Sequence, residues 1–182
     1  TFYSARFNNQ WEATRRFMAS ALADIRPFAD ERLVFSPSVY WHRDVDHYQL
    51  TRGKEGAQNG ENYHRMDVYG ASLNAHTTWL LGKTAVGVDL RKEHILSTAY
   101  GMLLDESEWT AIHGSDRHYD HLGDRTNTSL FLEHNVILGG FTLSAGVLAN
   151  RNTGLDNRFR FYPGVDISYR PNDNWKFYAS WN

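Results

Sequence analysis

Apolar and polar residues alternate along most of the chain, most clearly over residues 125–150. Within Phe141–Asn150 the odd positions are apolar (Leu143, Ala145, Val147, Ala149) and the even positions mainly small or polar (Ser144, Gly146, Asn150, with Leu148 the exception). A period of two is typical of a β-strand with one apolar and one polar face. Gly139-Gly140 joins this run to Arg125–Leu138 and has the composition of a tight turn. The two runs therefore predict a β-hairpin.

The same alternation predicts further strands at Trp11–Ala23, Leu33–Arg52, Tyr63–Trp79, Thr84–Thr98, Phe159–Arg170 and Trp175–Trp181. In Trp11–Ala23 it is weak, and an amphipathic helix competes there because Ala, Leu, Met, Arg and Glu favour helix. Ala99–Asp124 has no clean period and is expected to be a long loop. The fold class we expect is all-β, an antiparallel meander of about eight long strands.

Strand length and loop length both favour a membrane β-barrel. Strands in soluble proteins usually have about 5–6 residues, whereas a strand that spans a bilayer needs about 9–11. The connections also alternate in length, as short periplasmic turns and longer extracellular loops do in such barrels. The short ones are Asp24–Arg32, Leu81–Lys83, Gly139–Gly140 and Pro171–Asn174, and the longer ones are Gly53–Asn62, Ala99–Asp124 and Arg151–Arg158. We therefore expect the strands to form part of a transmembrane β-barrel.

Composition narrows the function classes. The 182 residues fit one domain and contain no run of about 18 apolar residues, as a transmembrane helix would need. A net charge of −2 gives no basic field for nucleic acid, and the absence of cysteine excludes disulfides and thiolate metal sites. Aromatic residues make up 14% of the chain. They suit either the interfacial girdles of a barrel or the core of a soluble sandwich.

The densest chemical cluster is the segment His113–His121 within the long loop. Loops carry function, and we expect ligand contacts from Trp109, His113, His118, Tyr119 and His121. A divalent metal held by His118, His121, Asp116 and Asp120 is an alternative by ligand type. The spacing of these residues matches no metal motif, so we assign no metal and no cofactor.

Catalytic motifs are missing from the sequence. It has no Gly-x-Ser-x-Gly, no phosphate-binding glycine loop and no His-Glu-x-x-His. Asp89, Glu93 and Glu133 fit a polar channel wall without further chemistry. We therefore expect a protein that is not an enzyme.

Three segments resemble one family. Thr1-Phe-Tyr-Ser-Ala-Arg-Phe-Asn-Asn-Gln-Trp-Glu-Ala-Thr14, Asn127–Asn150 and Phe161–Asn182 are similar, in this order, to barrel segments of TonB-dependent outer-membrane receptors of the Bacteroides group. The resemblance implies a barrel of about twenty-two strands that encloses a plug domain. It also implies uptake of a scarce ligand (an iron–siderophore, cobalamin, a glycan or a peptide), driven by TonB through the plug. Residues 1–182 are then expected to be a partial barrel domain in the outer membrane, without the plug.

Two hypotheses of different classes follow. The first is this receptor segment, whose partners would be outer-membrane lipid and, in the full receptor, a small-molecule ligand and TonB. The second is a soluble β-sandwich or small barrel that binds a ligand, such as a carbohydrate. Apolar residues on alternate positions would face lipid in the first case and meet in one core in the second: Val86, Val88, Leu90, Leu130, Leu132, Leu143, Val147, Val165, Ile167, Phe177 and Trp181. An isolated segment, with open sheet edges, is expected to curl or self-associate.

Overall fold

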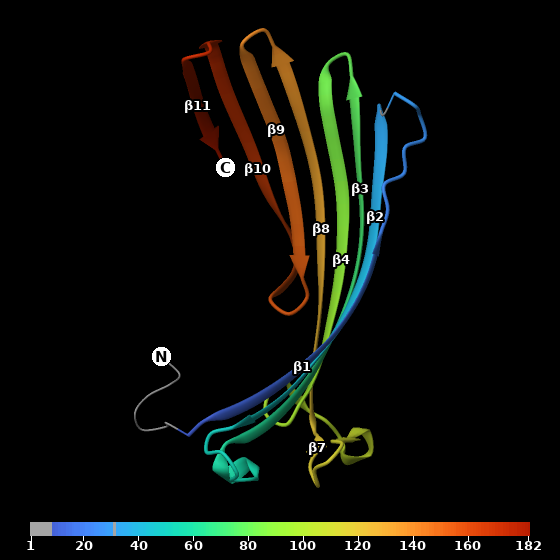
Figure 1. Cartoon of the computed structure of the whole chain (residues 1–182), viewed down its shortest axis with the longest axis vertical. Helices are drawn as coiled ribbons and strands as arrows, with labels where there is room; N and C mark the ends of the chain where they lie inside the picture. The colour runs from blue at the N-terminus through green and yellow to red at the C-terminus, as the bar shows by residue number, and fades with distance from the viewer. Residues whose placement is uncertain (1–8, 31) are drawn as a thin grey trace. The chain divides into compact units, whose positions relative to one another are not determined.

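The computed structural model describes residues 9–30 and 32–182, so the first eight residues of the N-terminal resemblance lie outside the described residues. Nearly all of the regular structure is strand (Figure 1). The elements are β1 (Trp11–Leu22), β2 (Leu33–Gln49), η2 (Ala57–Asn59), β3 (Glu61–Trp79), β4 (Gly82–Ser97), β5 (Met102–Leu103), η3 (Glu106–Glu108), β6 (Thr110–Ala111), β7 (His118–Tyr119), β8 (His121–Leu138), β9 (Phe141–Asn152), β10 (Asp156–Asn172) and β11 (Trp175–Trp181). No helix among these residues has the length and apolar character needed to cross a membrane.

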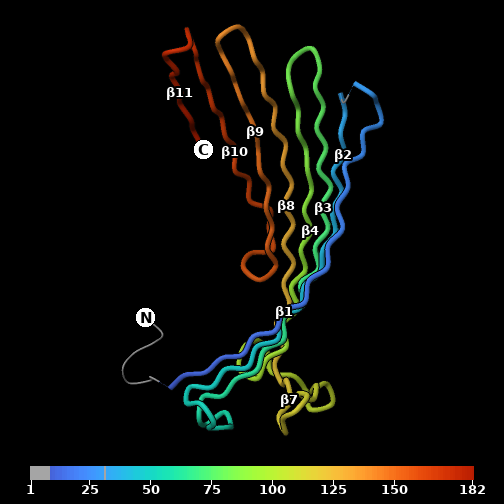
Figure 2. Tube along the Cα trace, viewed as in Figure 1, coloured from blue at the N-terminus to red at the C-terminus, as the bar shows by residue number. Residues whose placement is uncertain are grey.

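The long strands form an antiparallel meander, as the alternation predicts. Among the described residues the sheet follows the order β1-β2-β3-β4-β8-β9-β10-β11, and β5 pairs with β8 beside this path. Each strand of the path neighbours the next long strand in sequence, which the trace in Figure 2 lets the reader follow. The short strands β6 and β7 form a separate two-stranded sheet. The predicted all-β meander of eight long strands is confirmed.

The alternative prediction of a helix over residues 11–23 is wrong, and the predicted strand is confirmed. Residues Trp11–Leu22 form β1. Backbone hydrogen bonds from Ala23 N–H to the Pro37 oxygen (3.1 Å) and from Ile25 N–H to the Phe35 oxygen (2.8 Å) extend its pairing with β2. Helix propensity is a weak preference that pairing with a neighbouring strand overrides. Several strands also run further into polar sequence than predicted, with β8 beginning at His121 and β10 at Asp156.

The connections differ in part from the expected lengths. Those at Leu80–Leu81, Gly139–Gly140 and Asp173–Asn174 are short, and those at residues 50–60 and 98–120 are long, as predicted. The connection predicted as short at Asp24–Arg32 is wrong in length, because β1 ends at Leu22 and β2 begins at Leu33, which makes it nearly as long as residues 50–60. The connection predicted at Arg151–Arg158 contains only Thr153–Leu155, because Thr153 N–H bonds to the Thr126 oxygen (3.1 Å) and the flanking strands extend. The segment 99–124, predicted as a loop, contains β5, η3, β6, β7 and the start of β8.

The described residues divide into two compact units. Unit 1 comprises those up to Ala19, Trp41–Tyr69 and Lys92–Arg125. Unit 2 comprises Ser20–Tyr40, Gly70–Arg91 and Thr126–Asn182.

Unit 2 has two chemically different faces, and strand register defines them. Leu143 pairs with Val136 on β8 and with Ile167 on β10. One position along, Ser144 pairs with Asn135 and Asp166. Directly paired residues of adjacent strands point to the same side of a sheet. The predicted alternation therefore extends across several strands as an apolar face and a polar face.

The apolar face of unit 2 is open. Of the eleven residues that separate the two sequence hypotheses, nine are exposed: Val86, Leu90, Leu130, Leu132, Leu143, Val165, Ile167, Phe177 and Trp181. Val88 and Val147 have intermediate exposure. Because these side chains do not meet in a common core, the arrangement differs from that expected of a soluble sandwich. An apolar surface of this kind needs a cover.

Close contacts between strands of unit 2 require glycine. A Cβ atom built on Gly70 would lie 2.1 Å from Cε1 and Cζ of Tyr40, and one built on Gly87 would lie 2.2 Å from Cε1 of Phe131. The absence of a side chain at Gly70 and Gly87 thus makes room for two aromatic rings from neighbouring strands.

Unit 1 has a small hydrophobic core. The buried residues Leu96, Ile112 and Tyr119 pack together, with Tyr63, Leu104 and Leu122 against them. Leu104, Ile112 and Tyr119 lie within the segment between β4 and β8, and the other three lie on long strands. This core holds the long connection in a defined position, where it can carry functional side chains.

Candidate functional site

A buried carboxylate organises unit 1. Glu61, the first residue of β3, has only 1% of its surface exposed. Its Oε1 atom accepts hydrogen bonds from His47 Nε2 (2.8 Å), Gln49 Nε2 (3.0 Å) and the Tyr63 hydroxyl (3.1 Å). Its Oε2 atom accepts one from the Gly56 N–H (2.7 Å). Glu61 and these partners, together with Arg117, are called the Glu61 junction below.

Arg117 connects the junction to the segment after β6. Its Nη1 atom donates a hydrogen bond to the Glu61 backbone oxygen (2.7 Å) and lies 3.8 Å from Glu61 Oε2. Its guanidinium carbon lies 5.8 Å from the centre of the Tyr63 ring, within the range of a cation–π contact. The three residues join two connections that are far apart in the sequence.

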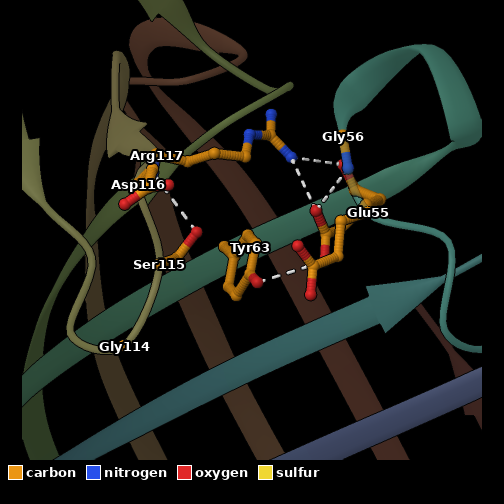
Figure 3. Close-up of a pocket in the computed structure, with 8 residues that line it drawn as sticks. Glu55, Gly56, Tyr63, Gly114, Ser115, Asp116 and Arg117 are labelled. Carbon is orange, nitrogen blue, oxygen red and sulfur yellow. Dashed lines mark hydrogen bonds and ion pairs between the residues drawn. The ribbon is translucent and has the colours of Figure 1, made fainter.

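A polar cavity of about 600 Å³ opens beside the junction (Figure 3). It is lined by Glu55, Gly56, Glu61, Tyr63, Gly114, Ser115, Asp116 and Arg117. Most of these groups are already bonded to one another. These contacts join the connection before β3 to the segment after β6.

The hydrogen bonds fix the ionisation of the junction. Burial alone would raise the pKa of Glu61, but the bonds from Gly56, Gln49, His47 and Tyr63 outweigh it and lower this pKa to about 2. Burial also raises the pKa of Tyr63. A hydrogen bond with Ser115 acts to lower this pKa, whereas the hydrogen bond and the negative charge of Glu61 raise it further. Glu61 is consequently a carboxylate and Tyr63 a neutral phenol at neutral pH.

The residues predicted to contact a ligand lie near one another but differ in exposure. Trp109 is 39% exposed, and its Nε1 atom donates to the Leu104 oxygen (3.1 Å). Its ring centre lies 6.1 Å from that of His118, which is exposed. His113 is also exposed, whereas Tyr119 is only 4% exposed and belongs to the core. His121 is half-buried, with Nδ1 2.7 Å from Oδ1 of Asp120.

The metal alternative requires at least three of the polar side chains of this segment to converge. Within residues 9–30 and 32–182, no group of three or more His, Asp or Glu side chains is arranged to hold a metal ion. His121 and Asp120 bond to each other, and Asp116 instead lines the cavity beside Glu61.

A second polar cavity, which the sequence analysis did not identify, is formed by residues of unit 1, mainly from β1, β2 and β3. Its volume is about 390 Å³, and it is lined by Gln10, Glu12, Asp46, Tyr48, Asn62, His64 and Tyr100. His64 bonds through Nδ1 to the Ser97 hydroxyl (2.9 Å) and stacks on Tyr100, with ring centres 5.1 Å apart. Carboxylates beside aromatic rings suit a cationic or hydroxyl-rich ligand.

Charges in this second cavity interact. The negative charge of Asp46 raises the pKa of Glu12, and burial and a hydrogen bond with Asp46 act in the same direction. Burial lowers the pKa of His64, and the negative charge of Asp46 acts in the opposite direction. In the sequence, only the alternation of Asp44, Asp46 and Tyr48 along β2 hints at this cavity. That pattern does not predict a cavity by itself, because the other residues that line it come from distant parts of the sequence.

Comparison with known proteins identifies the fold. The sequence matches no protein-family model, and no curated protein matches it. Among solved structures, the chain shares its fold with part of a β-barrel transporter. That structure is the ferric citrate transporter FecA in its unliganded form, with a TM-score of 0.57 and 15% sequence identity over 93% of this chain. The chain spans 27% of the length of that transporter.

Proposed function

We propose that the chain is a barrel segment of a TonB-dependent outer-membrane receptor of the Bacteroides type. The whole receptor would take up a scarce ligand, such as an iron–siderophore, cobalamin or a glycan, and would contact TonB through a plug domain. The observation that carries the proposal is the open apolar face of unit 2, in register across β8, β9 and β10 and opposite a polar face. Lipid covers such a face in a membrane barrel.

The polar face would line the interior of the barrel. Glu133 pairs with Gly146, and Asp166 pairs with Ser144, which gives this side carboxylates and small residues. Such a surface suits a water-filled passage or contact with a plug. The likeness in fold to a transporter supports this arrangement, which assigns binding and transport rather than catalysis to the chain.

The ligand would meet the chain in unit 1. We assign contacts with it to Trp109, His113, His118 and His121, which are at least partly exposed. Tyr119 is assigned a supporting role, because its burial fixes the position of the adjacent His118. The cavity with Glu12, Asp46 and His64 is a further contact region, because carboxylates and aromatic rings line it together.

Cysteine scanning tests the proposal, and the sequence contains no native cysteine to interfere. Single cysteines would replace Leu143, Ser144, Val165 and Asp166 in protein reconstituted into lipid vesicles. A membrane-impermeant maleimide should label positions 144 and 166, and a lipid-attached quencher should quench a fluorophore at 143 and 165. Equal labelling at all four positions would refute the membrane barrel.

A further inference from the structure

A third cavity lies in unit 1 on the side of the sheet that carries the Glu61 junction. Its volume is about 350 Å³, within the range of about 300–1,000 Å³ common for small-molecule sites. Its walls include Trp11 and Arg15 from β1, His47 from β2, Tyr63 and Arg65 from β3, and His113 from the segment after β6. No Asp or Glu side chain is among the described residues that line it.

Two arginines at this cavity have unused binding capacity. Arg15 is exposed and has no ion pair or hydrogen bond with another described residue. The Nε atom of Arg65 is buried without a hydrogen-bond partner. The atom forms an ion pair with Oδ2 of Asp67 at 3.7 Å, which is too long for a hydrogen bond. Buried N–H groups are rarely left unpaired in proteins, and this one keeps a donor that no acceptor of the described residues engages at hydrogen-bond distance.

The carboxylates of Asp67 and Glu61, close to this cavity in the fold, already form ion pairs with Arg43 and Arg117. Arg43 donates two hydrogen bonds to Asp67, from Nε to Oδ1 (2.7 Å) and from Nη2 to Oδ2 (3.0 Å). These bonds help to lower the pKa of Asp67 although its burial opposes them. Glu61 accepts four hydrogen bonds and pairs with Arg117. Asp67 is therefore shared between Arg43 and Arg65, so its single negative charge does not neutralise both guanidinium groups, and Arg15 adds a further positive charge at the cavity.

The remaining wall is aromatic. The His47 ring stacks on Tyr63, with ring centres 4.0 Å apart and planes inclined by 15°, and meets the edge of Trp11 at 5.0 Å. Tyr119, which also lines the cavity, has its ring centre 5.8 Å from the Arg65 guanidinium carbon. Such rings pack against the organic part of a ligand while the arginines bind its charged group.

We propose that this cavity binds the phosphate group of an organic phosphate through Arg15 and Arg65. Guanidinium groups match phosphate oxygens in geometry and charge. The exposed His113 adds a second type of donor at the same opening. The phosphate could belong to a lipid headgroup or to a soluble phosphate ester. Neither source depends on the membrane function proposed above.

Titration calorimetry on the detergent-solubilised chain tests this site with two probes, dihexanoyl phosphatidic acid and inorganic phosphate. Arg15→Gln and Arg65→Gln should each weaken binding roughly tenfold, because each removes a charge-assisted contact. Arg158→Gln, which changes an exposed arginine on β10, is the matched control and should bind as the unaltered protein does.

The results distinguish a lipid headgroup from a soluble phosphate ester, and they also define when the proposal fails. Binding of both probes supports a phosphate site open to soluble esters, and binding of the phosphatidic acid alone supports a lipid headgroup site. The proposal is overturned if neither probe binds, or if Arg15→Gln binds as tightly as the unaltered protein. Because Arg15 is exposed, its variant keeps the test decisive even if Arg65→Gln does not fold. Circular dichroism would report the folding of each variant.

Discussion

Arg117 donates a hydrogen bond to the backbone oxygen of Glu61 across 56 positions of sequence. The bond joins the segment after β6 to the start of β3, where Gly56 and His47 also converge. One charged group thereby holds the segment between β6 and β7 to the first residue of β3.

Replacing Arg117 should release the segment that it holds. Arg117→Met removes a bond from a charged donor, and such bonds are worth about 1.5–3 kcal/mol. Amide hydrogen exchange of residues 110–119 should rise by the corresponding factor while exchange in β9 and β10 stays unchanged. Arg158→Met, an exposed arginine on β10, should leave both regions unaffected. Unchanged exchange near Arg117 would show that the core alone holds this segment.

Stability at low pH should depend on Glu61. The pKa of Glu61 is about 2 when folded and about 4.3 when unfolded, so its contribution is present above pH 4.3 and is lost as pH falls towards 2. This lowering of the Glu61 pKa corresponds to about 3 kcal/mol of unfolding free energy. Denaturant titrations should show Glu61→Gln losing less stability than the unaltered protein between pH 4.5 and 2. If the unfolding free energy of both proteins changes equally with pH, the lowered pKa is not that of Glu61.

A matched control exists for that titration. Glu108 is exposed in η3, so Glu108→Gln should retain the full pH dependence of the unaltered protein.

The contact between Gly70 and Tyr40 should be sensitive to one methyl group. Gly70→Ala places a Cβ atom 2.1 Å from the Tyr40 ring, and overpacking of this kind typically costs about 1–3 kcal/mol. Adding Tyr40→Ala should recover part of the loss in a double-mutant cycle of thermal unfolding. Gly164→Ala is the control, because its nearest contact would be an ordinary 3.7 Å. Additive effects of the two changes would argue against the contact.

A charge on the apolar face should cost more than one on the polar face. If lipid covers Ile167, Ile167→Arg should lower the folding free energy in bilayers by about 2–4 kcal/mol near the membrane midplane. Ser168→Arg, one residue along β10 and on the other face, should cost much less. Urea unfolding in vesicles measures both. Equal losses would place both residues in water.

Sequence alternation was sufficient for the strands whose faces differ in polarity. Leu143, Ala145 and Val147 identified β9 because one side of that strand is apolar throughout. Pairing through backbone bonds needs no such pattern, and the polar ends of β3 and β8 were therefore missed. Glu61 and His121 begin those strands although their side chains give no strand signal.

The candidate sites were less predictable because their partners are distant in sequence. The Glu61 junction depends on bonds spanning from 2 to 56 residues, which residue types alone do not specify. Tyr119 was predicted as a ligand contact from its polar surroundings, yet its side chain is buried with Leu96 and Ile112. The sequence located the segment that carries exposed histidines, but could not show which of its side chains point inward.

The small core of unit 1 anchors a connecting segment through a few apolar side chains. Leu104, Ile112 and Tyr119 attach the segment between β4 and β8 to side chains presented by the long strands. A replacement segment with three apolar anchors of similar size would dock in the same place, whatever its exposed residues. Exposed positions such as His113 and His118 can thus vary in sequence without disturbing this anchoring.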